Sequence, residues 1–417
     1  MKKLPCPVTR ATRLATFAAL FFLFAAPARA GDAYEWSQFT PDGVELRAVT
    51  QEAACPKASI DGRPAEMTVR AAPDAAFPVL VCALPVPRDA KEAAIRDRPM
   101  PLRVERFERV ALVGDTGCRL NVLVLQGCNS MRDWPFRMVA DAIAEMAPQL
   151  VLHLGDLIYR ERACPIADKN CAGSPWGDNW ETWKAEFFDP AHALLTVAPF
   201  VFVRGNHEDC ARNGAGWNRF VSPFPFAPAC QPQEVPYRID LGGLTLAVFD
   251  VTRAEDRGVD AALAPLFREQ FAWTKTLEGP VWIAMHKGVW GSARLKDGVN
   301  EGHNLTLGEA ARGAIPPNVA ALVSGHLHVF QAMSFAEDFP AQIISGTGGD
   351  VLDRLAPQDI AGKSFGAATV ENGRGVSTLF GFTIMQRGAG DWTLTHYDAH
   401  ERVLAQCRLN GRKLACE

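Results

Sequence analysis

Short runs of four to six residues recur along most of the chain, and in each of them most of the consecutive positions are apolar. They lie at residues 110–113, 150–154, 199–203, 244–249, 281–285, 320–323 and 341–344. Such runs are typical of strands in a sheet that is covered on both faces. A helix is predicted between the first two, where apolar side chains recur at helical spacing as Phe136, Val139, Ile143 and Met146. This order of strand, helix and strand predicts an α/β domain.

The pattern differs toward both ends of the chain. Residues 31–106 contain short alternating runs, such as 67–70 and 79–82, separated by proline and glycine. They predict a small β-rich region. We expect this region to pack against the main domain rather than to bind substrate, because it holds no histidine and no acidic cluster. Residues 378–414 also alternate and predict a C-terminal β-hairpin.

One further helix is predicted after an irregular insertion at residues 160–177. Its large apolar side chains are Trp180, Trp183, Phe187 and Phe188. Their spacing predicts an amphipathic helix whose aromatic face packs into the core.

The first thirty residues have the order of a secretory signal peptide. Basic side chains precede an apolar segment at residues 14–26, and Ala28-Arg29-Ala30 follows. The apolar segment is well short of the ~20 residues that span a membrane. We therefore expect cleavage after Ala30 and export to the periplasm or the medium, with no membrane span in the mature chain.

Charge gives no indication of a nucleic-acid partner. The chain has 417 residues and a formal net charge of -4. The leader holds five basic residues and no acidic one, so its removal changes the charge to -9. A mildly acidic chain has no general attraction for nucleic acid or for an anionic membrane surface.

The cysteines predict disulfides. Of eleven, Cys6 is lost with the leader, and an even number remains. Pairing neighbours in sequence gives the shortest loops, namely 55–82, 118–128, 164–171, 210–230 and 407–416. A structural zinc site is the alternative, but the chain has no CxxC pair.

Several of the apolar runs end in side chains that bind metals. These side chains are Asp115, Asp156, Tyr159, Asn206, His286, His326 and His328. They offer carboxylate, phenol, amide and imidazole groups without a thiolate, which are hard or borderline ligands. Such a set suits two metal ions about 3.5–4 Å apart, with a carboxylate between them, acting on a phosphoryl group.

These stretches resemble, in number, order and spacing, the five motifs of the purple acid phosphatases, which are calcineurin-like metallophosphoesterases. The motifs read Gly114-Asp-Thr-Gly117, Gly155-Asp-Leu-Ile-Tyr159, Gly205-Asn-His-Glu208, Ile283-Ala-Met-His286 and Gly325-His-Leu-His328. The resemblance covers the chain from Asp115 to His328.

The resemblance implies a ligand set for each of two ions. The implied ligands of a ferric ion are Asp115, Tyr159 and His328. Those of a divalent iron, zinc or manganese ion are Asn206, His286 and His326, with Asp156 as the bridge. Most relatives in the superfamily carry Asp-x-His in the first motif, whereas Gly117 stands at that position here. Because Tyr159 could supply a phenolate to the same ion, we expect a ferric site rather than two manganese ions.

The resemblance also gives His207 a role beside the ligands. In the family this imidazole contacts the substrate, and it is proposed to protonate the leaving group or to orient the phosphate. An imidazole can act as an acid in mildly acidic solution. We expect in-line attack of a metal-bound hydroxide on phosphorus, with Asp156 and His207 as the catalytic groups. A histidine that merely packs in the loop is the alternative interpretation.

The other histidines are weighed by their positions. His303 lies between His286 and His326, where the family carries substrate-contacting histidines, often as an adjacent pair. Only one is present here, so His303 is a candidate substrate contact. His153 lies within an apolar run and is expected to be structural. Glu208 could support the metal ligands or be a solvated loop residue.

Together these features predict an α/β fold, a four-layer sandwich of two mixed β-sheets flanked by helices. A small β-rich region at 31–106 precedes a phosphoesterase domain at 107–417 with its C-terminal hairpin. The expected function is that of an acid phosphatase-like hydrolase acting on small phosphate monoesters. A phosphodiesterase or nucleotide hydrolase on the same metal core is the alternative. A non-catalytic binding protein is a third possibility, but the complete ligand set counts against it.

Overall fold

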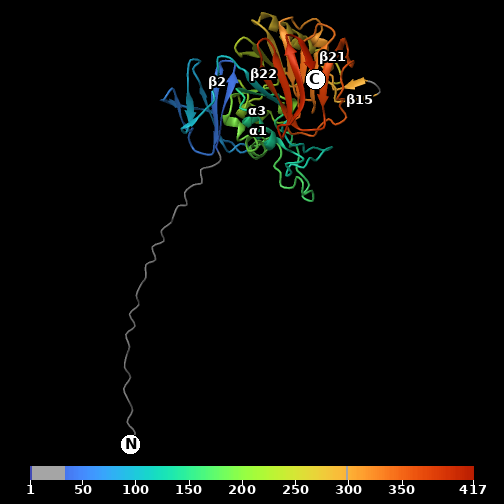
Figure 1. Cartoon of the computed structure of the whole chain (residues 1–417). Helices are drawn as coiled ribbons and strands as arrows, with labels where there is room; N and C mark the ends of the chain where they lie inside the picture. Colours follow the sequence, from blue (N-terminus) through green and yellow to red (C-terminus); the bar gives the residue numbers. More distant parts are fainter. Residues whose placement is uncertain (2–32, 297–298) are drawn as a thin grey trace. The chain divides into compact units, whose positions relative to one another are not determined.

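The computed structural model describes Met1, residues 33–296 and residues 299–417 (Figure 1). The predicted signal peptide and its cleavage after Ala30 lie outside the described residues, apart from Met1. No helix among the described residues has both the length and the hydropathy needed to cross a membrane. From residue 33 onward the described residues form one compact unit.

The first large sheet is built around three parallel strands, β9 (Arg109–Val113), β10 (Leu150–His153) and β11 (Phe200–Phe202). The chain's C-terminal strands extend it beyond β9 in the order β22 (Gly381–Arg387), β23 (Trp392–Asp398), β24 (Val403–Asn410) and β25 (Lys413–Cys416). The sequence predicts a single hairpin here. Three turns, at residues 388–391, 399–402 and 411–412, divide the segment into an antiparallel meander instead.

The N-terminal region extends the same sheet on its other side. Strand β1 pairs in parallel with β11, at Gln38 and Phe200. The strands beyond β11 are β1 (Tyr34–Thr40), β2 (Gly43–Thr50), β6 (Leu80–Pro85) and β5 (Thr68–Ala71). A separate antiparallel sheet is formed by β4 (Arg63–Glu66), β3 (Lys57–Ile60), β7 (Ala93–Ile95) and β8 (Arg98–Pro99). Residues 31–106 are β-rich as predicted, but part of them belongs to the main sheet; that they form a domain of their own stays a prediction.

The second large sheet has a parallel centre and antiparallel edges. Its strands, in spatial order, are β12 (Tyr237–Asp240), β13 (Thr245–Phe249), β14 (Val281–Met285), β17 (Val319–Ser324), β19 (Ala341–Ser345), β18 (Phe330–Phe335), β21 (Ala368–Val376) and β20 (Ser364–Phe365). A small hairpin, β15 (Arg294–Lys296) and β16 (Val299–Glu301), stands apart. In Figure 1 the N-terminal strands, in blue, lie on the opposite side of the domain from β21.

Helices cover the outer face of each sheet. Those over the first sheet are α1 (Phe136–Glu145), α2 (Trp180–Trp183), the π-helix η1 (Lys184–Phe188) and α3 (Gly214–Phe220). Those over the second are α4 (Ala264–Trp273) and α5 (Leu305–Ala311). Short 3-10 turns lie at η2 (Leu194–Thr196), η3 (Asn206–Glu208) and η4 (Thr274–Thr276). The four-layer sandwich of two mixed sheets predicted from the sequence is confirmed.

The continuous apolar runs follow from this layering. In β9, Val110 and Leu112 belong to the core between the two sheets, whereas Ala111 and Val113 belong to the core beneath the helices. Because successive side chains of a strand point to opposite faces, a sheet covered on both sides needs apolar residues at every position. The predicted aromatic face of residues 180–188 is also buried in the core beneath the helices.

All five predicted disulfides are present. They join Cys55–Cys82, Cys118–Cys128, Cys164–Cys171, Cys210–Cys230 and Cys407–Cys416. Three of them close loops that follow Asp115, Tyr159 and Asn206 in the sequence. Their number is typical of a protein that folds in an oxidising compartment outside the cytoplasm.

We predict that the disulfide nearest the predicted ligands affects metal retention, whereas a distant one does not. Cys118→Ser with Cys128→Ser frees the loop whose Leu120 N–H donates to Tyr159 O at 3.1 Å. Metal content of the purified variant should therefore fall. The matched control, Cys407→Ser with Cys416→Ser at the edge strands, should lose about 2–4 kcal/mol of unfolding free energy and keep its metal content. Equal metal content in the two variants would contradict the prediction.

Candidate metal centre

The five predicted motifs follow parallel strands of the two sheets. Asp115, Asp156 and Asn206 follow β9, β10 and β11, and His286 and His326 follow β14 and β17. Because the carboxyl ends of neighbouring parallel strands lie at one edge of a sheet, each sheet brings its own motif loops together. Contacts between the loops then join the two groups across the sandwich.

One group of side chains surrounds the phenol of Tyr159. Its Oη lies 3.0 Å from Asp115 Oδ1, 2.7 Å from Asp156 Oδ2 and 3.0 Å from His328 Nε2. His328 Nε2 is also 3.4 Å from Asp115 Oδ1. These four residues are the predicted ligands of the ferric ion together with the predicted bridge.

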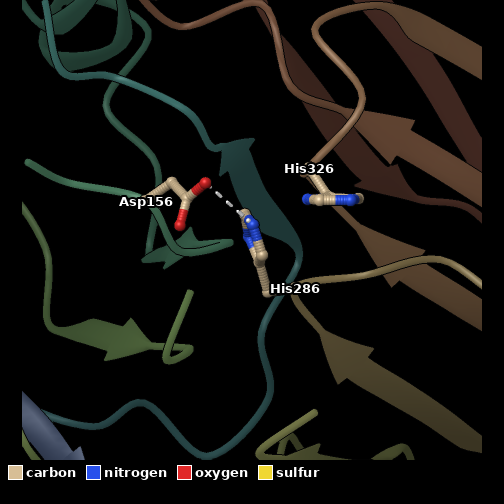
Figure 2. Close-up of side chains that lie close together, drawn as sticks. All are labelled: Asp156, His286 and His326. Atoms are coloured by element: carbon tan, nitrogen blue, oxygen red, sulfur yellow. Dashed lines mark ion pairs between the residues drawn. The ribbon is translucent and has the colours of Figure 1, made fainter. Parts of the chain in front are cut away.

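A second group shares Asp156 with the first. Ligand atoms of Asp156, His286 and His326 all lie within 4.8 Å of one another, and Figure 2 shows these three side chains. His286 Nε2 is 3.0 Å from Asp156 Oδ2. Asp156 is therefore the carboxylate that contacts both groups of side chains.

Two imidazole rings are held with one nitrogen turned to these groups. His286 Nδ1 lies 2.7 Å from Leu154 O, and His328 Nδ1 lies 2.7 Å from Val351 O. A carbonyl oxygen only accepts, so each Nδ1 carries a proton and donates it. In the neutral ring this leaves the lone pair on Nε2, the form in which histidine binds a metal.

The amide of Asn206 also fits a metal site. Its Oδ1 is buried without a hydrogen-bond partner among the described residues. A buried carbonyl-type oxygen without a partner is costly, and a cation beside it would remove that cost. The donor set and this atom are both consistent with a binuclear centre.

Backbone geometry marks the same positions. Asp115, Asp156 and His326 have φ values of 58°, 56° and 69°. Non-glycine residues rarely adopt this left-handed region, and each such residue costs on the order of 1–3 kcal/mol. The strained positions are three of the predicted metal ligands. The fold is therefore less stable at the positions whose side chains must point into the site.

Buried carboxylates dominate the electrostatics of the centre. Burial raises the pKa of Tyr159 well above its usual value, and Asp115 and Asp156 raise it further. Burial opposes protonation of His286 and His328, yet Asp156 raises the pKa of His286 to about 9, and Asp350 raises that of His328 to about 10. Bound cations would offset this excess of negative charge, and they would lower the pKa of the Tyr159 phenol instead of raising it.

His207 lies beside the ligands. Its Nε2 is 4.0 Å from Asp156 Oδ2, and its ring centroid is 3.9 Å from that of Tyr159. Glu161 Oε1 is 2.9 Å from His207 Nδ1 on the other side of the ring. The imidazole therefore lies between these carboxylates at the wall of a cavity of about 1680 Å³.

The cavity extends beyond the predicted ligands. His303 lines it, with its ring centroid 6.0 Å from that of Phe365. Trp290 and Phe339 add apolar surface, and Arg119 adds a cation. His153 lies outside the cavity lining, buried, with its Nε2 3.0 Å from Thr116 Oγ1. Another histidine outside the motifs, His396, is buried against Phe330.

Two buried glutamates hold the ligand loops. Glu208 accepts hydrogen bonds from the N–H groups of Asp156, Leu157, Ile158 and Gly205, at 2.7–3.2 Å. Glu186 accepts from those of Cys118, Tyr159 and Arg160, at 2.6–3.3 Å. The sequence analysis left the role of Glu208 open and passed over Glu186. The signal for Glu186 is its place three residues after Trp183, on the buried face of the aromatic segment.

Asp350, Arg119 and Asp256 were also missed. Asp350 is fully buried, pairs with Arg119 and lies 3.5 Å from His328 Nε2. Asp256 Oδ1 lies 3.3 Å from His326 Nε2. Asp350 follows the glycine-rich end of the run at 341–344, so it carried the same strand-end signal as the five motifs. Asp256 lies in a polar loop, and its sequence position carries no comparable signal.

The packing around Gly117 explains why no side chain stands there. A Cβ at this position would lie 2.5 Å from Glu186 Oε1 and 2.8 Å from Tyr159 Cδ2. Both neighbours are buried, so they could not move aside cheaply. A histidine at 117 and the observed position of Tyr159 exclude each other.

We predict that Glu208→Gln loses metal ions and stability. The amide offers one acceptor oxygen where the carboxylate offers two, which leaves backbone N–H groups of the 156–158 loop without partners. We expect a loss of about 2–4 kcal/mol in unfolding free energy, measured by denaturant titration, and a reduced metal content. Asp209→Asn, the neighbouring carboxyl whose contact is with the Ala211 N–H, is the control and should change stability by less than about 0.5 kcal/mol. Wild-type metal content in Glu208→Gln would contradict the expected role.

Comparison with known proteins agrees with this geometry. The model of the family described as calcineurin-like phosphoesterase matches residues 108–330, which is more than half of the chain. Purple acid phosphatase 23 of Arabidopsis thaliana is 20% identical over 292 residues, which cover 64% of this chain and 58% of that protein. The match thus spans less than two thirds of the plant protein's length.

Two solved structures share the fold across most of the chain. Purple acid phosphatase PPD1 from yellow lupin (Lupinus luteus) seeds superposes with a TM-score of 0.61 and 12% identity, covering 91% of this chain and 74% of that one. PhoD superposes with a TM-score of 0.55 and 9% identity, covering 93% and 91%. At these identities the similarity to solved structures shows the fold alone. The family model covers more than half of the chain, so the chain belongs to the calcineurin-like phosphoesterase family, and purple acid phosphatases are among its distant relatives.

Proposed function

We propose that this chain is an acid phosphatase-like hydrolase that cleaves phosphate monoesters at a centre of two metal ions. The observation that carries the proposal is the position of Asp156, whose carboxylate contacts both groups of predicted ligands. Membership of the family implies a phosphoester substrate and a binuclear centre. The distant purple acid phosphatase relatives support the monoester assignment.

The ligand assignment divides the two groups between the ions. Asp115, Tyr159 and His328 would hold a ferric ion, and Asn206, His286 and His326 a divalent iron, zinc or manganese ion, with Asp156 between them. When bound, such a pair of cations neutralises phosphoryl charge and lowers the pKa of water. The crowding around Gly117 supports the ferric assignment, because the position that would carry a histidine ligand is filled by the Tyr159 ring and the Glu186 carboxylate.

His207 would protonate the leaving oxygen or orient the phosphate. It lines the cavity next to Asp156 and Tyr159, and its Nδ1 faces Glu161 Oε1 at 2.9 Å. With Nδ1 occupied by a carboxylate, Nε2 is the nitrogen available to the substrate. Glu161 is itself paired with Arg212 at 2.9 Å, so the carboxylate is held in place from both sides. His303 would contact the substrate farther along the same cavity.

The size of the cavity favours a second candidate. A volume of about 1680 Å³ exceeds that of typical small-molecule sites, and aromatic side chains and arginines line it away from the predicted ligands. A phosphodiester or a nucleotide would use this additional space. The metal ligands are the same for either substrate, so the cavity wall would decide between them.

The five disulfides support an exported protein, and we propose the periplasm or the medium as its location. The acidic formal charge of the mature chain is consistent with a small substrate and gives no support for nucleic-acid binding.

We predict that the metal-loaded protein hydrolyses a generic aryl phosphate. His207→Ala should lower kcat by about a hundredfold or more, the effect of losing a general acid. Asp156→Asn should lower activity at least as much, since both ions lose a ligand. His400→Ala, an exposed histidine outside the motifs, is the control and should retain activity. Full activity in Asp156→Asn would remove the bridging assignment, and an inactive wild-type protein with two bound ions would favour a binding protein.

The same assay separates the two substrate classes. Steady-state kinetics with an aryl monoester and the matching aryl diester should give the higher kcat/KM for the monoester. The reverse order would favour the phosphodiesterase, with the metal assignment unchanged.

We predict a visible charge-transfer band from a tyrosinate bound to ferric iron. The band should be present in the iron-containing protein and absent from Tyr159→Phe, in which the ring packing is kept and the phenolate is lost. Absorbance spectroscopy combined with metal analysis makes the measurement. A colourless, fully active protein that contains manganese would rule out the ferric assignment.

A further inference from the structure

Arg119 is a cation built into the wall of the candidate site. Its backbone is fixed by the disulfide at Cys118 and by an exchange with Gln126, whose Oε1 accepts from Arg119 N and whose N–H donates to Arg119 O, both at 2.9 Å. The side chain is 24% exposed and lines the cavity. The five predicted motifs do not include Arg119.

The guanidinium is held in one orientation by a buried acid. Arg119 Nε donates to both carboxylate oxygens of Asp350, at 2.9 and 3.1 Å, and Nη2 donates to Asp350 Oδ2. Asp350 is fully buried, and its own N–H donates to Asp115 O at 2.9 Å. Such paired contacts fix the planar group, so little rotamer entropy remains to be lost on binding a ligand.

The orientation brings the cation to the predicted ferric ligands. Arg119 Cζ lies 4.9 Å from the centroid of the Tyr159 ring, and Nη2 lies 3.4 Å from His328 Nε2. The four other arginines that line the cavity are exposed at the surface, namely Arg257, Arg294, Arg312 and Arg354. Arg119 is thus placed to act on whatever group the ligands hold.

A count of donors leaves part of the guanidinium free. An arginine has five N–H groups: Asp350 accepts from Nε and from Nη2, and Nη2 also lies 3.4 Å from His328 Nε2. Nη1 has no hydrogen bond to any described residue. Since the side chain is partly exposed toward the cavity, these N–H groups can reach a ligand in it.

We propose that Arg119 donates hydrogen bonds to a non-bridging oxygen of the phosphoryl group, and that Asp350 is the positioning residue that aims it. The proposal rests on the phosphoesterase function and adds a phosphate contact to it. A fixed guanidinium next to the predicted metal ligands would stabilise the negative charge on the phosphoryl oxygens in the transition state.

The direct test measures the binding of inorganic phosphate to the metal-loaded protein by titration calorimetry. Arg119→Gln should weaken the phosphate Kd by about tenfold or more, the loss of a charge-assisted hydrogen bond, while two metal ions per chain remain. Arg119→Lys keeps the positive charge but lacks the planar guanidinium, so its phosphate Kd should lie between those of the wild type and Arg119→Gln. Arg132→Gln, an arginine with an 89% exposed side chain beyond the same disulfide, is the control and should bind as the wild type does.

Kinetics on an aryl phosphate separate contact from positioning. For Arg119→Gln, kcat/KM should fall by about 10²-fold, as when one donor to a transition-state oxygen is removed. Added guanidinium ion should restore part of the activity of Arg119→Ala. Asp350→Asn should raise KM and the phosphate Kd more than it lowers kcat, because the arginine remains but is no longer aimed.

Three outcomes would overturn the proposal. Wild-type phosphate affinity in Arg119→Gln would show that the arginine does not contact the anion. Loss of phosphate binding in step with loss of metal would show that Arg119 only balances the charge of Asp350 beside His328. If Arg119→Gln does not fold, unchanged phosphate affinity in the folded Arg119→Lys would count equally against it. An inactive wild-type protein that still binds phosphate through Arg119 would refute the hydrolase function and leave this contact standing.

Discussion

The arrangement of the centre depends on buried carboxylates that accept hydrogen bonds from the backbone of the ligand loops. Glu208 takes four N–H groups from the loops of Asp156 and Gly205, and Glu186 takes three from those of Cys118 and Tyr159. Loops that turn sharply at a strand end leave their amides unpaired, and burial makes that costly. The two glutamates supply the missing acceptors, so the strained turns at Asp115 and Asp156 can persist.

The same carboxylates give the site an excess of buried acidic groups. Burial and the Asp156 charge raise the pKa of Glu208 to about 8, and burial raises that of Glu186 to about 7. Carboxyl groups this crowded resist ionisation unless cations are near. Arg160 pairs with Glu186, and Arg119 pairs with Asp350. The centre therefore combines fixed arginines at its edge with a middle suited to metal ions.

Several features were predictable because they depend on local sequence. Apolar runs gave the strands near their observed limits, since a sheet covered on both faces requires apolar residues at every position. Cysteine neighbours gave all five disulfides, since each closes a short loop. The C-terminal segment was less well predicted, because an alternating pattern indicates strands without fixing their number. Three short turns separate four strands where one hairpin was expected. Likewise, β1 pairs with β11, a partner far away in sequence that no local pattern names.

The sequence by itself determined the donor set and its order along the chain, because side-chain type decides what each position can bind. Only the tertiary structure decided which donors meet. Hydrogen bonds to distant carbonyl oxygens orient the rings of His286 and His328. Glu186 leaves no room for a side chain at position 117, and Asp350 forms an ion pair with Arg119. These partners lie between 23 and 231 residues apart in sequence. Contacts over such separations exist only when both sheets have packed, so no motif or periodicity could have shown them.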